Sequence, residues 1–193
     1  MKIKKILAAN RSEIAIRIFR AAEESGIRTA AIYSQEDRFA LHRFKTDESY
    51  LVGEGKGPIK AYLDIPSIIG IAKKAKVDAI HPGYGFLSES PELAEACKKN
   101  NIIFIGPTSS ILKQLGNKIE AIKVAKKAGV ATIPSVILEK NDFKNLEKNA
   151  KNIGYPIMVK ASWGGGGRGM RIVKESQDLL DQVTIAQSEA KKT

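Results

Sequence analysis

A lysine and an arginine flank four consecutive glycines in one segment of the chain. This segment reads KASWGGGGRGM from Lys160 to Met170, and it stands between the apolar runs YPIMV and RIV. Glycine adds no packing to a strand, and its backbone loses the most freedom on ordering. A loop without side chains can place several backbone amides against one anion, and a neighbouring lysine adds a positive charge. The pattern predicts a loop that covers a phosphate group.

Other glycine-rich motifs fit this segment less well. A Walker A loop would continue with Gly-Lys-Ser/Thr, and a Rossmann fingerprint would follow the first strand and open a helix. A flexible linker would not lie between β-branched runs, and a nucleic-acid segment of the Arg-Gly type would repeat that pair, which occurs once here.

The composition indicates a globular protein with no nucleic-acid or membrane partner. The 193 residues carry a net charge of +11, but the lysines are spread along the chain, and aromatic residues make up only 6%. Bases would need aromatic side chains for stacking. No apolar run approaches the roughly 18 residues of a membrane span. The start, MKIKKILAANRSEIA, predicts a first strand, and Cys97 lies in a helical pattern that predicts a buried thiol. We expect a cytoplasmic protein.

The first part of the chain alternates apolar runs with helical periodicity, which predicts a doubly wound, Rossmann-like parallel sheet. Ser12 is the expected helix N-cap and Gly26 the expected helix stop. Ligands of such sheets bind beyond the carboxyl ends of the strands, where the loop after Ile80 is expected. His81 is expected to be a structural residue that bonds to this loop. The expected strands cover 3–10, 27–34, 48–53, 77–81 and 102–107, and the expected helices cover 12–25, 65–76 and 91–100.

The pattern changes after Pro107, because two helices follow each other with only Gly116 between them. We therefore expect two domains, 1–114 and 115–193, the second being α+β. Two short strands flank the glycines, and 175–193 reads as an amphipathic helix with Leu179, Val183 and Ala186 on one face.

Five segments occur in the order and spacing seen in biotin carboxylases, which are ATP-grasp enzymes. The segments are ANRSEIAIRIFRAA, AIHPGYGFLSES, FIGP, LGNKIEA and PIMVKASWGGGGRGMRIV. The resemblance covers essentially the whole chain and implies an incomplete ATP-grasp lid subdomain after the N-terminal domain. Within the family, LHRFKTDESYLVGEGKGPIKAYLDI resembles pyruvate carboxylases, and the acetyl-CoA and propionyl-CoA carboxylases remain alternatives.

The resemblance also implies roles for individual positions. Lys118 and Lys160 match lysines that bind ATP phosphates. Tyr84 and Gly85 match positions beside biotin and bicarbonate, and Arg20 and Glu24 match a homodimer contact; a solvated i,i+4 pair is the alternative for these two. The lid that folds over ATP matches Gly164, Gly165, Gly166, Gly167, Arg168, Gly169 and Met170. The sequence departs from the family pattern at Ser12, Ser90, Asn117 and Trp163.

The implied enzyme is a ligase that carboxylates biotin with bicarbonate and ATP. The carboxyl group is then used to convert pyruvate into oxaloacetate. Its implied partners are ATP, bicarbonate and a biotinylated carrier domain in a homo-oligomer. Family members continue well past residue 193, and that part holds the Mg²⁺ ligands and the catalytic base. We therefore expect no catalytic or metal residue in this chain, which by itself would be an inactive fragment. Another ATP-grasp ligase and a non-catalytic nucleotide-binding module are the rival interpretations.

Overall fold

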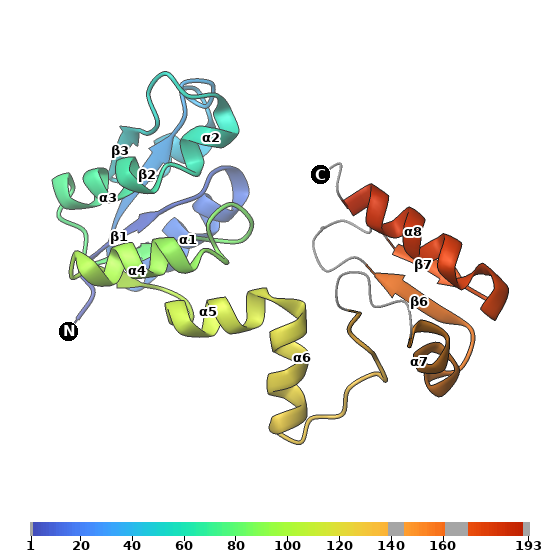
Figure 1. The fold of residues 1–193 in the computed structure, drawn as a ribbon. Helices are drawn as coiled ribbons and strands as arrows, with labels where there is room; N and C mark the ends of the chain where they lie inside the picture. The colour runs from blue at the N-terminus through green and yellow to red at the C-terminus, as the bar shows by residue number, and fades with distance from the viewer. Residues whose placement is uncertain (1, 139–144, 161–169, 191–193) are drawn as a thin grey trace. The chain divides into compact units, whose positions relative to one another are not determined.

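The chain forms two compact units, Met1–Gly116 and Asn117–Thr193, in a computed structural model (Figure 1). The structure describes residues 2–138, 145–160 and 170–190, apart from the side chains of Lys118 and Ala190. Each unit is described by itself. None of the helices in the described ranges is long and apolar enough to cross a membrane.

Unit 1 is built on a five-stranded sheet in the order β3-β2-β1-β4-β5, and every neighbouring pair is parallel. This confirms the predicted doubly wound parallel sheet. The chain adds strands to one side of β1 and then crosses to its other side, so the topological switch point lies between β1 and β4. The strands are β1 (Lys5–Ala8), β2 (Arg28–Tyr33), β3 (Glu48–Leu51), β4 (Ala79–His81) and β5 (Ile103–Phe104).

Different helices cover the two faces of this sheet, because successive side chains of a strand point to opposite faces. Ile6 and Ala8 of β1 pack with α1 (Ser12–Glu24). Leu7 lies on the other face, in a core with residues of α2 (Pro58–Tyr62), α3 (Ile65–Lys74) and α4 (Pro91–Lys99). The remaining elements of unit 1 are the 3₁₀ helix η1 (Leu41–Phe44) and α5 (Ser109–Gly116).

Local stop signals in the sequence act as predicted at the end of α1. The N–H of Gly26 donates to the carbonyl of Glu23 at 2.9 Å, and the N–H of Ile27 donates to that of Ala22 at 2.8 Å. This is a Schellman motif, and Gly26 has the positive φ of 67° that the motif requires. The buried position of Cys97 in α4 is likewise confirmed.

The predicted N-cap of α1 is wrong. The cap position is Arg11, whose side chain makes no capping bond, and Ser12 is the first helical residue with a φ of 55°. The N–H of Arg11 instead donates to Oδ1 of Asn10 at 2.9 Å. The Asn10 side chain is bonded to the loop that follows β4. This contact between distant segments, and not a local capping bond, decides how the backbone enters α1.

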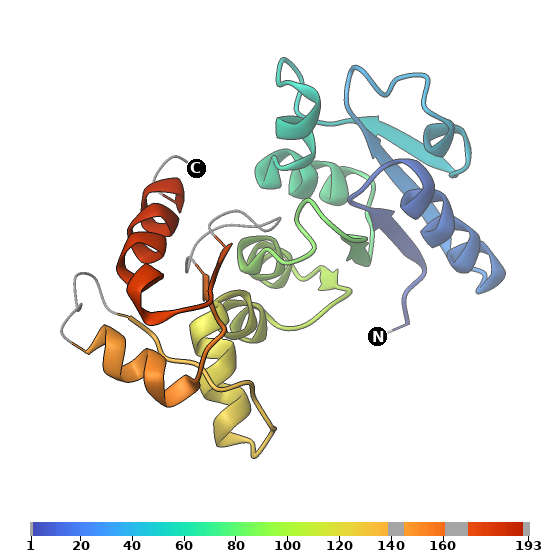
Figure 2. The same ribbon diagram turned by 90° about the vertical axis from the view of Figure 1, so that its right-hand side faces the viewer.

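Unit 2 contains an antiparallel hairpin of β6 (Ile157–Lys160) and β7 (Met170–Val173), as predicted for the strands around the glycines. One core joins the hairpin to α7 (Leu146–Ile153) and α8 (Leu179–Ala190). Figure 2 shows both helices on the same side of the hairpin. Leu179, Val183 and Ala186 are buried, which confirms the predicted apolar face. The unit also contains α6 (Lys118–Lys127) and the 3₁₀ helix η2 (Ser176–Asp178).

Candidate functional site

The carboxyl ends of β1 and β4 lie side by side at the switch point of unit 1. The N–H of Ala9 donates to the carbonyl of His81 at 2.9 Å, which extends the strand pairing to the last residue of β4. Asn10 follows on one side and the loop 82–86 on the other. Ligands of doubly wound sheets bind at this place, because the loops diverge there and leave a crevice.

Two residues hold the backbone of the loop after β4. Nδ2 of Asn10 donates to the carbonyl oxygens of Pro82 and Tyr84, at 2.7 and 2.8 Å. Nδ1 of His81 accepts from the N–H of Gly83 at 3.0 Å, which confirms the predicted structural histidine. Burial lowers the pKa of His81, which favours the neutral ring that this bond requires.

Tyr84 and Gly85, the predicted neighbours of biotin and bicarbonate, lie at the outer edge of this loop. The Tyr84 side chain is 62% exposed, and its hydroxyl donates to a carboxylate oxygen of Glu13 in the first turn of α1. Gly85 is exposed with a φ of 65°, and no atom beyond its two chain neighbours lies within 4 Å of the place where its Cβ would be. Both residues are therefore accessible to a ligand.

A second set of contacts supports the far end of the loop. Asp37, which follows β2, binds Arg11 and accepts a hydrogen bond from the Tyr62 hydroxyl at 2.7 Å. The ring of Tyr62 stacks on Phe86 with 5.1 Å between the ring centroids. Loops after β1, β2 and β4 are thereby connected. Neither Asn10 nor this set was predicted from the sequence.

The charges in this set stabilise one another. Burial by itself would raise the pKa of Asp37, but the hydrogen bonds from Arg11 and Tyr62 favour its carboxylate and bring the pKa below its ordinary value. The bond to Asp37 raises the pKa of Arg11. Burial and then the bond to Asp37 raise the pKa of Tyr62, so its hydroxyl remains a donor.

The hairpin of unit 2 has one exposed face with an apolar surface and a cation. Lys160 lies opposite Met170, and Met158 lies opposite Ile172. These four side chains share a face, since residues alternate along a strand, while Val173 on the other face is buried against α7 and α8. Met158 is 47%, Met170 40% and Ile172 62% exposed. An apolar surface that ends in a lysine suits a ligand with a flat ring and an anionic group, such as a nucleotide.

Met158 and Ile172 were not predicted as site residues. The period-2 alternation of the strands IMVK and MRIV would have indicated them. It places Met158 on the same face as Lys160, and Ile172 on the same face as Met170. The predicted glycine loop with Arg168, together with Trp163, lies outside the described residues.

Lys118 is the first residue of α6. The cap residue before it is Asn117, whose Oδ1 accepts from the N–H groups of Ile119 and Glu120 at 2.9 and 3.3 Å. Asn117 therefore fixes where the helix begins. Ser90, another departure from the family pattern, caps α4 in the same way through the N–H of Leu93.

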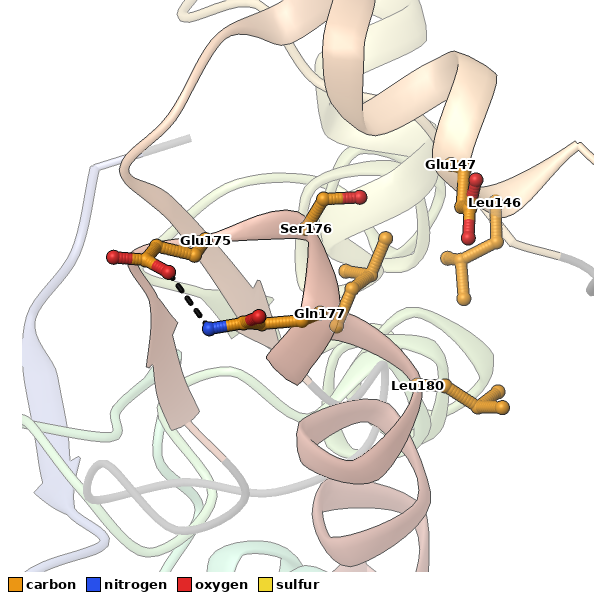
Figure 3. Close-up of a pocket in the computed structure, with 7 residues that line it drawn as sticks. Leu146, Glu147, Glu175, Ser176, Gln177 and Leu180 are labelled. Carbon is orange, nitrogen blue, oxygen red and sulfur yellow. Dashed lines mark hydrogen bonds between the residues drawn. The ribbon is translucent and has the colours of Figure 1, made fainter.

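One cavity of unit 2 is lined, among the residues that the structure describes, by none of the predicted nucleotide residues (Figure 3). It measures about 680 Å³ and lies between the start of α7 and the segment that leads into α8. Glu147 and Glu175 line it together with Ser176, Gln177 and three leucines. Glu175 accepts a hydrogen bond from Gln177 at 2.8 Å. Among the described residues that line the cavity there are two carboxylates and no lysine or arginine, a set that does not suit a phosphate ligand.

Arg20 and Glu24, the predicted dimer contact, are both exposed on α1. Within the described residues, no ion pair joins them. The same part of the chain contains no group of three or more His, Cys, Asp or Glu that could hold a metal ion.

Comparisons with known proteins agree with these features. Residues 2–112 match the family "Biotin carboxylase, N-terminal domain", and residues 117–193 match "Carbamoyl-phosphate synthase L chain, ATP binding domain". The biotin carboxylase domain of Hydrogenobacter thermophilus 2-oxoglutarate carboxylase, solved with MgADP, ADP and bicarbonate, is 41% identical with a TM-score of 0.88. This similarity covers 100% of this chain and 42% of that chain. The fold is thus that of an ATP-grasp protein with an α/β N-terminal domain.

Relatives with curated functions include Bacillus subtilis pyruvate carboxylase, which is 54% identical over 189 residues, 98% of this chain and 16% of that protein. Haemophilus influenzae biotin carboxylase is 46% identical over 190 residues, 98% of this chain and 42% of that protein. The chain belongs to the biotin carboxylase family. It spans about a sixth of the length of the pyruvate carboxylases that it matches.

Proposed function

We propose that the chain supplies two parts of a biotin carboxylase: the loop beside biotin and bicarbonate, and one wall of the ATP site. The observation that carries this proposal is the exposed loop with Tyr84 and Gly85 at the switch point of the sheet, in a chain of the biotin carboxylase family. In the proposed reaction, bicarbonate attacks the γ-phosphate of ATP and releases ADP. The bond between the carboxyl carbon of the resulting carboxyphosphate and its phosphate oxygen then breaks, a bond to N1′ of biotin forms, and the leaving phosphate takes up the N1′ proton.

The chain's own contribution to the first step is charge neutralisation and positioning, which supply most of the rate in phosphoryl transfer. We assign the phosphate contacts to Lys118, Lys160 and the amides of Gly164–Gly169, with Arg168 beside them. Met170 belongs to the same site, and its exposure next to Lys160 supports this assignment. Mg²⁺ would neutralise phosphate charge as well, but we assign it no ligand in this chain.

We further propose that biotin arrives on a separate carrier domain and that Arg20 and Glu24 contact a second copy of the chain. Their exposure on α1 supports this. Pyruvate is the proposed final acceptor, because identity to a pyruvate carboxylase (54%) exceeds identity to a free-standing biotin carboxylase (46%).

A chimera tests the biotin carboxylase activity. This chain replaces the matching segment of Bacillus subtilis pyruvate carboxylase, and the comparison protein is the parent enzyme. We expect bicarbonate-dependent ADP release that free biotin stimulates, at a rate within about tenfold of the parent. A folded chimera whose ADP release does not respond to biotin would contradict the proposal. The acceptor is tested separately, with the natural protein supplied with pyruvate, acetyl-CoA or propionyl-CoA; only pyruvate should be carboxylated.

A further inference from the structure

Asn10 holds the loop after β4 through both hydrogens of its side-chain amide. It is 3% exposed, and its two bonds reach carbonyl oxygens that lie 72 and 74 residues further along the chain. Its Oδ1 accepts from the N–H of Arg11, so both ends of the amide are engaged and the side chain has one orientation. A buried amide with this set of partners is rigid.

The residue between the two bonded carbonyls is Gly83. Its φ is 67°, and a Cβ at this position would lie 2.7 Å from Nδ2 of Asn10. The loop therefore passes as close to Asn10 as a residue without a side chain permits. This close approach determines where the backbone of Tyr84 lies relative to β1.

A second residue of the same segment holds the Tyr84 side chain. Glu13 lies three positions after Asn10 and accepts a hydrogen bond from the Tyr84 hydroxyl. The ring of Tyr84 is otherwise largely exposed, so this bond restricts its rotation. Backbone and phenol of Tyr84 are thus both held by the segment that runs from the end of β1 into the first turn of α1.

We propose that Asn10 and Glu13 are positioning residues for the transfer of the carboxyl group to biotin, a role that rests on the proposed function. Asn10 sets the backbone of the loop, and Glu13 sets the phenol of Tyr84. A loop that borders the acceptor must present it in line with the donor, and small displacements lower such rates strongly. Formation of ADP relies mainly on the phosphate contacts assigned to Lys118, Lys160 and the glycine amides, so a displaced loop should lower it much less than the transfer to biotin.

The experiment measures the two steps separately in the chimera described above. Asn10→Asp is isosteric and replaces the two N–H donors by an oxygen that faces two carbonyl oxygens. We expect kcat/KM for free biotin to fall about tenfold or more, while ADP release without biotin stays within about twofold. Asn100→Asp is the matched control, because Nδ2 of Asn100 donates to the carbonyl of Ala96 at 2.8 Å, at the end of α4. It should change neither rate. Equal losses in both steps, or no loss, would overturn the role of Asn10.

Glu13 provides a test that does not depend on a buried residue. We expect Glu13→Ala and Tyr84→Phe to lower kcat/KM for biotin by similar factors, and the double variant to be no worse than either. Glu13→Gln keeps an acceptor oxygen and should restore most of the loss. Independent, additive effects would show that Glu13 does not act through the Tyr84 hydroxyl.

Hydrogen exchange on the 193-residue chain adds a readout without turnover. Asn10→Asp should accelerate exchange in the segment 82–86 and leave the amides of α4 unchanged. Unchanged exchange in 82–86 would contradict the positioning role even if activity falls. If the unmodified chimera shows no response to biotin, the proposed function fails and the role in carboxyl transfer fails with it, whereas the exchange result still decides whether Asn10 holds the loop.

Discussion

A single nitrogen of Arg11, Nη1, donates to both carboxylate oxygens of Asp37, at 2.9 and 3.1 Å. Arg11 follows β1 and Asp37 follows β2, so this pair ties together the carboxyl ends of two neighbouring strands. The Asp37 side chain is 15% exposed, whereas that of Arg11 is 42% exposed. The charged form of Asp37 is therefore stabilised mainly by its hydrogen bonds with Arg11 and Tyr62, and less by solvation.

Asp37→Asn should destabilise the chain at pH 7 by about 1–2 kcal/mol, since it weakens charge-assisted bonds in a partly exposed pair. The pKa of Asp37 is lowered in the folded state. The stabilisation is therefore complete above the ordinary carboxyl pKa of about 4 and is lost as the pH falls through the lower folded-state pKa. Urea unfolding at pH 7 and at progressively lower pH measures this. Glu120→Gln, which removes an exposed pair with Lys123, should cost less than about 0.5 kcal/mol. A loss that is the same at every pH would contradict the ion-pair interpretation.

Two glycines with the same φ separate backbone strain from close approach. Gly26 and Gly83 both have a φ of 67°, but only Gly83 has atoms near its missing Cβ. Gly26→Ala should cost about 1–2 kcal/mol, from the left-handed conformation alone. Gly83→Ala should cost about 1–3 kcal/mol more, because the methyl group meets Asn10. Thermal unfolding of both variants measures the two losses of stability. Equal losses would show that the Asn10 side chain moves aside for the added methyl group.

The thiol of Cys97 should be unreactive in the folded chain. Burial raises its pKa to about 11, and its side chain is inaccessible in the core of unit 1. At pH 8 the reagent DTNB should label it only as fast as the protein opens, whereas one thiol per chain should react at once in denaturant. Rapid labelling of the folded protein would mean that α4 detaches easily from the sheet.

Lys160→Ala should lower kcat/KM for ATP in the chimera by about tenfold to a hundredfold, since a charge-assisted phosphate contact contributes roughly 1.5–3 kcal/mol. Lys174→Ala is the control, because Lys174 is an exposed lysine that follows β7 directly and should leave the kinetics unchanged. Melting temperatures of both variants should match that of the unmodified chimera. Equal kinetics for the two variants would remove Lys160 from the phosphate site.

Residues 1–116 should fold without the rest of the chain, because both faces of their sheet are covered by their own helices. A single cooperative thermal transition for this fragment is the expected result. Amide NMR shifts that match those of the 193-residue chain would show that the fold is the same. A fragment with dispersed shifts only in the presence of residues 117–193 would contradict the two-domain interpretation.

The order of elements in unit 1 was predictable from the sequence, because apolar runs, helical periodicity and stop signals act over a few residues. The helices α1, α3 and α4, the stop at Gly26 and the bond of His81 to the loop that follows it are examples. The elements that escaped prediction, α2 and η1, have five and four residues, too few for a periodicity to show. Pro58 at the start of α2 was the one usable signal for that helix.

His42 shows where local reasoning ends. Its position in the sequence, between Leu41 and Arg43, gave no sign of a role, yet it is fully buried, and its Nε2 donates to the carbonyl of Ile32 at 3.1 Å. Burial lowers its pKa, which keeps the ring neutral. Ile32 belongs to β2, an inner strand of the sheet, and His42 belongs to η1. Only the tertiary packing of η1 against β2 brings His42 to this carbonyl.

The sequence by itself determined the family and the parallel sheet, since each rests on short patterns of residue type and spacing. The same kind of pattern predicts the residues that contact phosphate. Tertiary structure alone decided which side chains hold the site. Asn10 meets the loop at Tyr84, and Asp37 meets Arg11 and Tyr62, because β1 lies between β2 and β4. Strand order is set by the packing of helices on the two faces of the whole sheet. No segment of the sequence contains that information on its own.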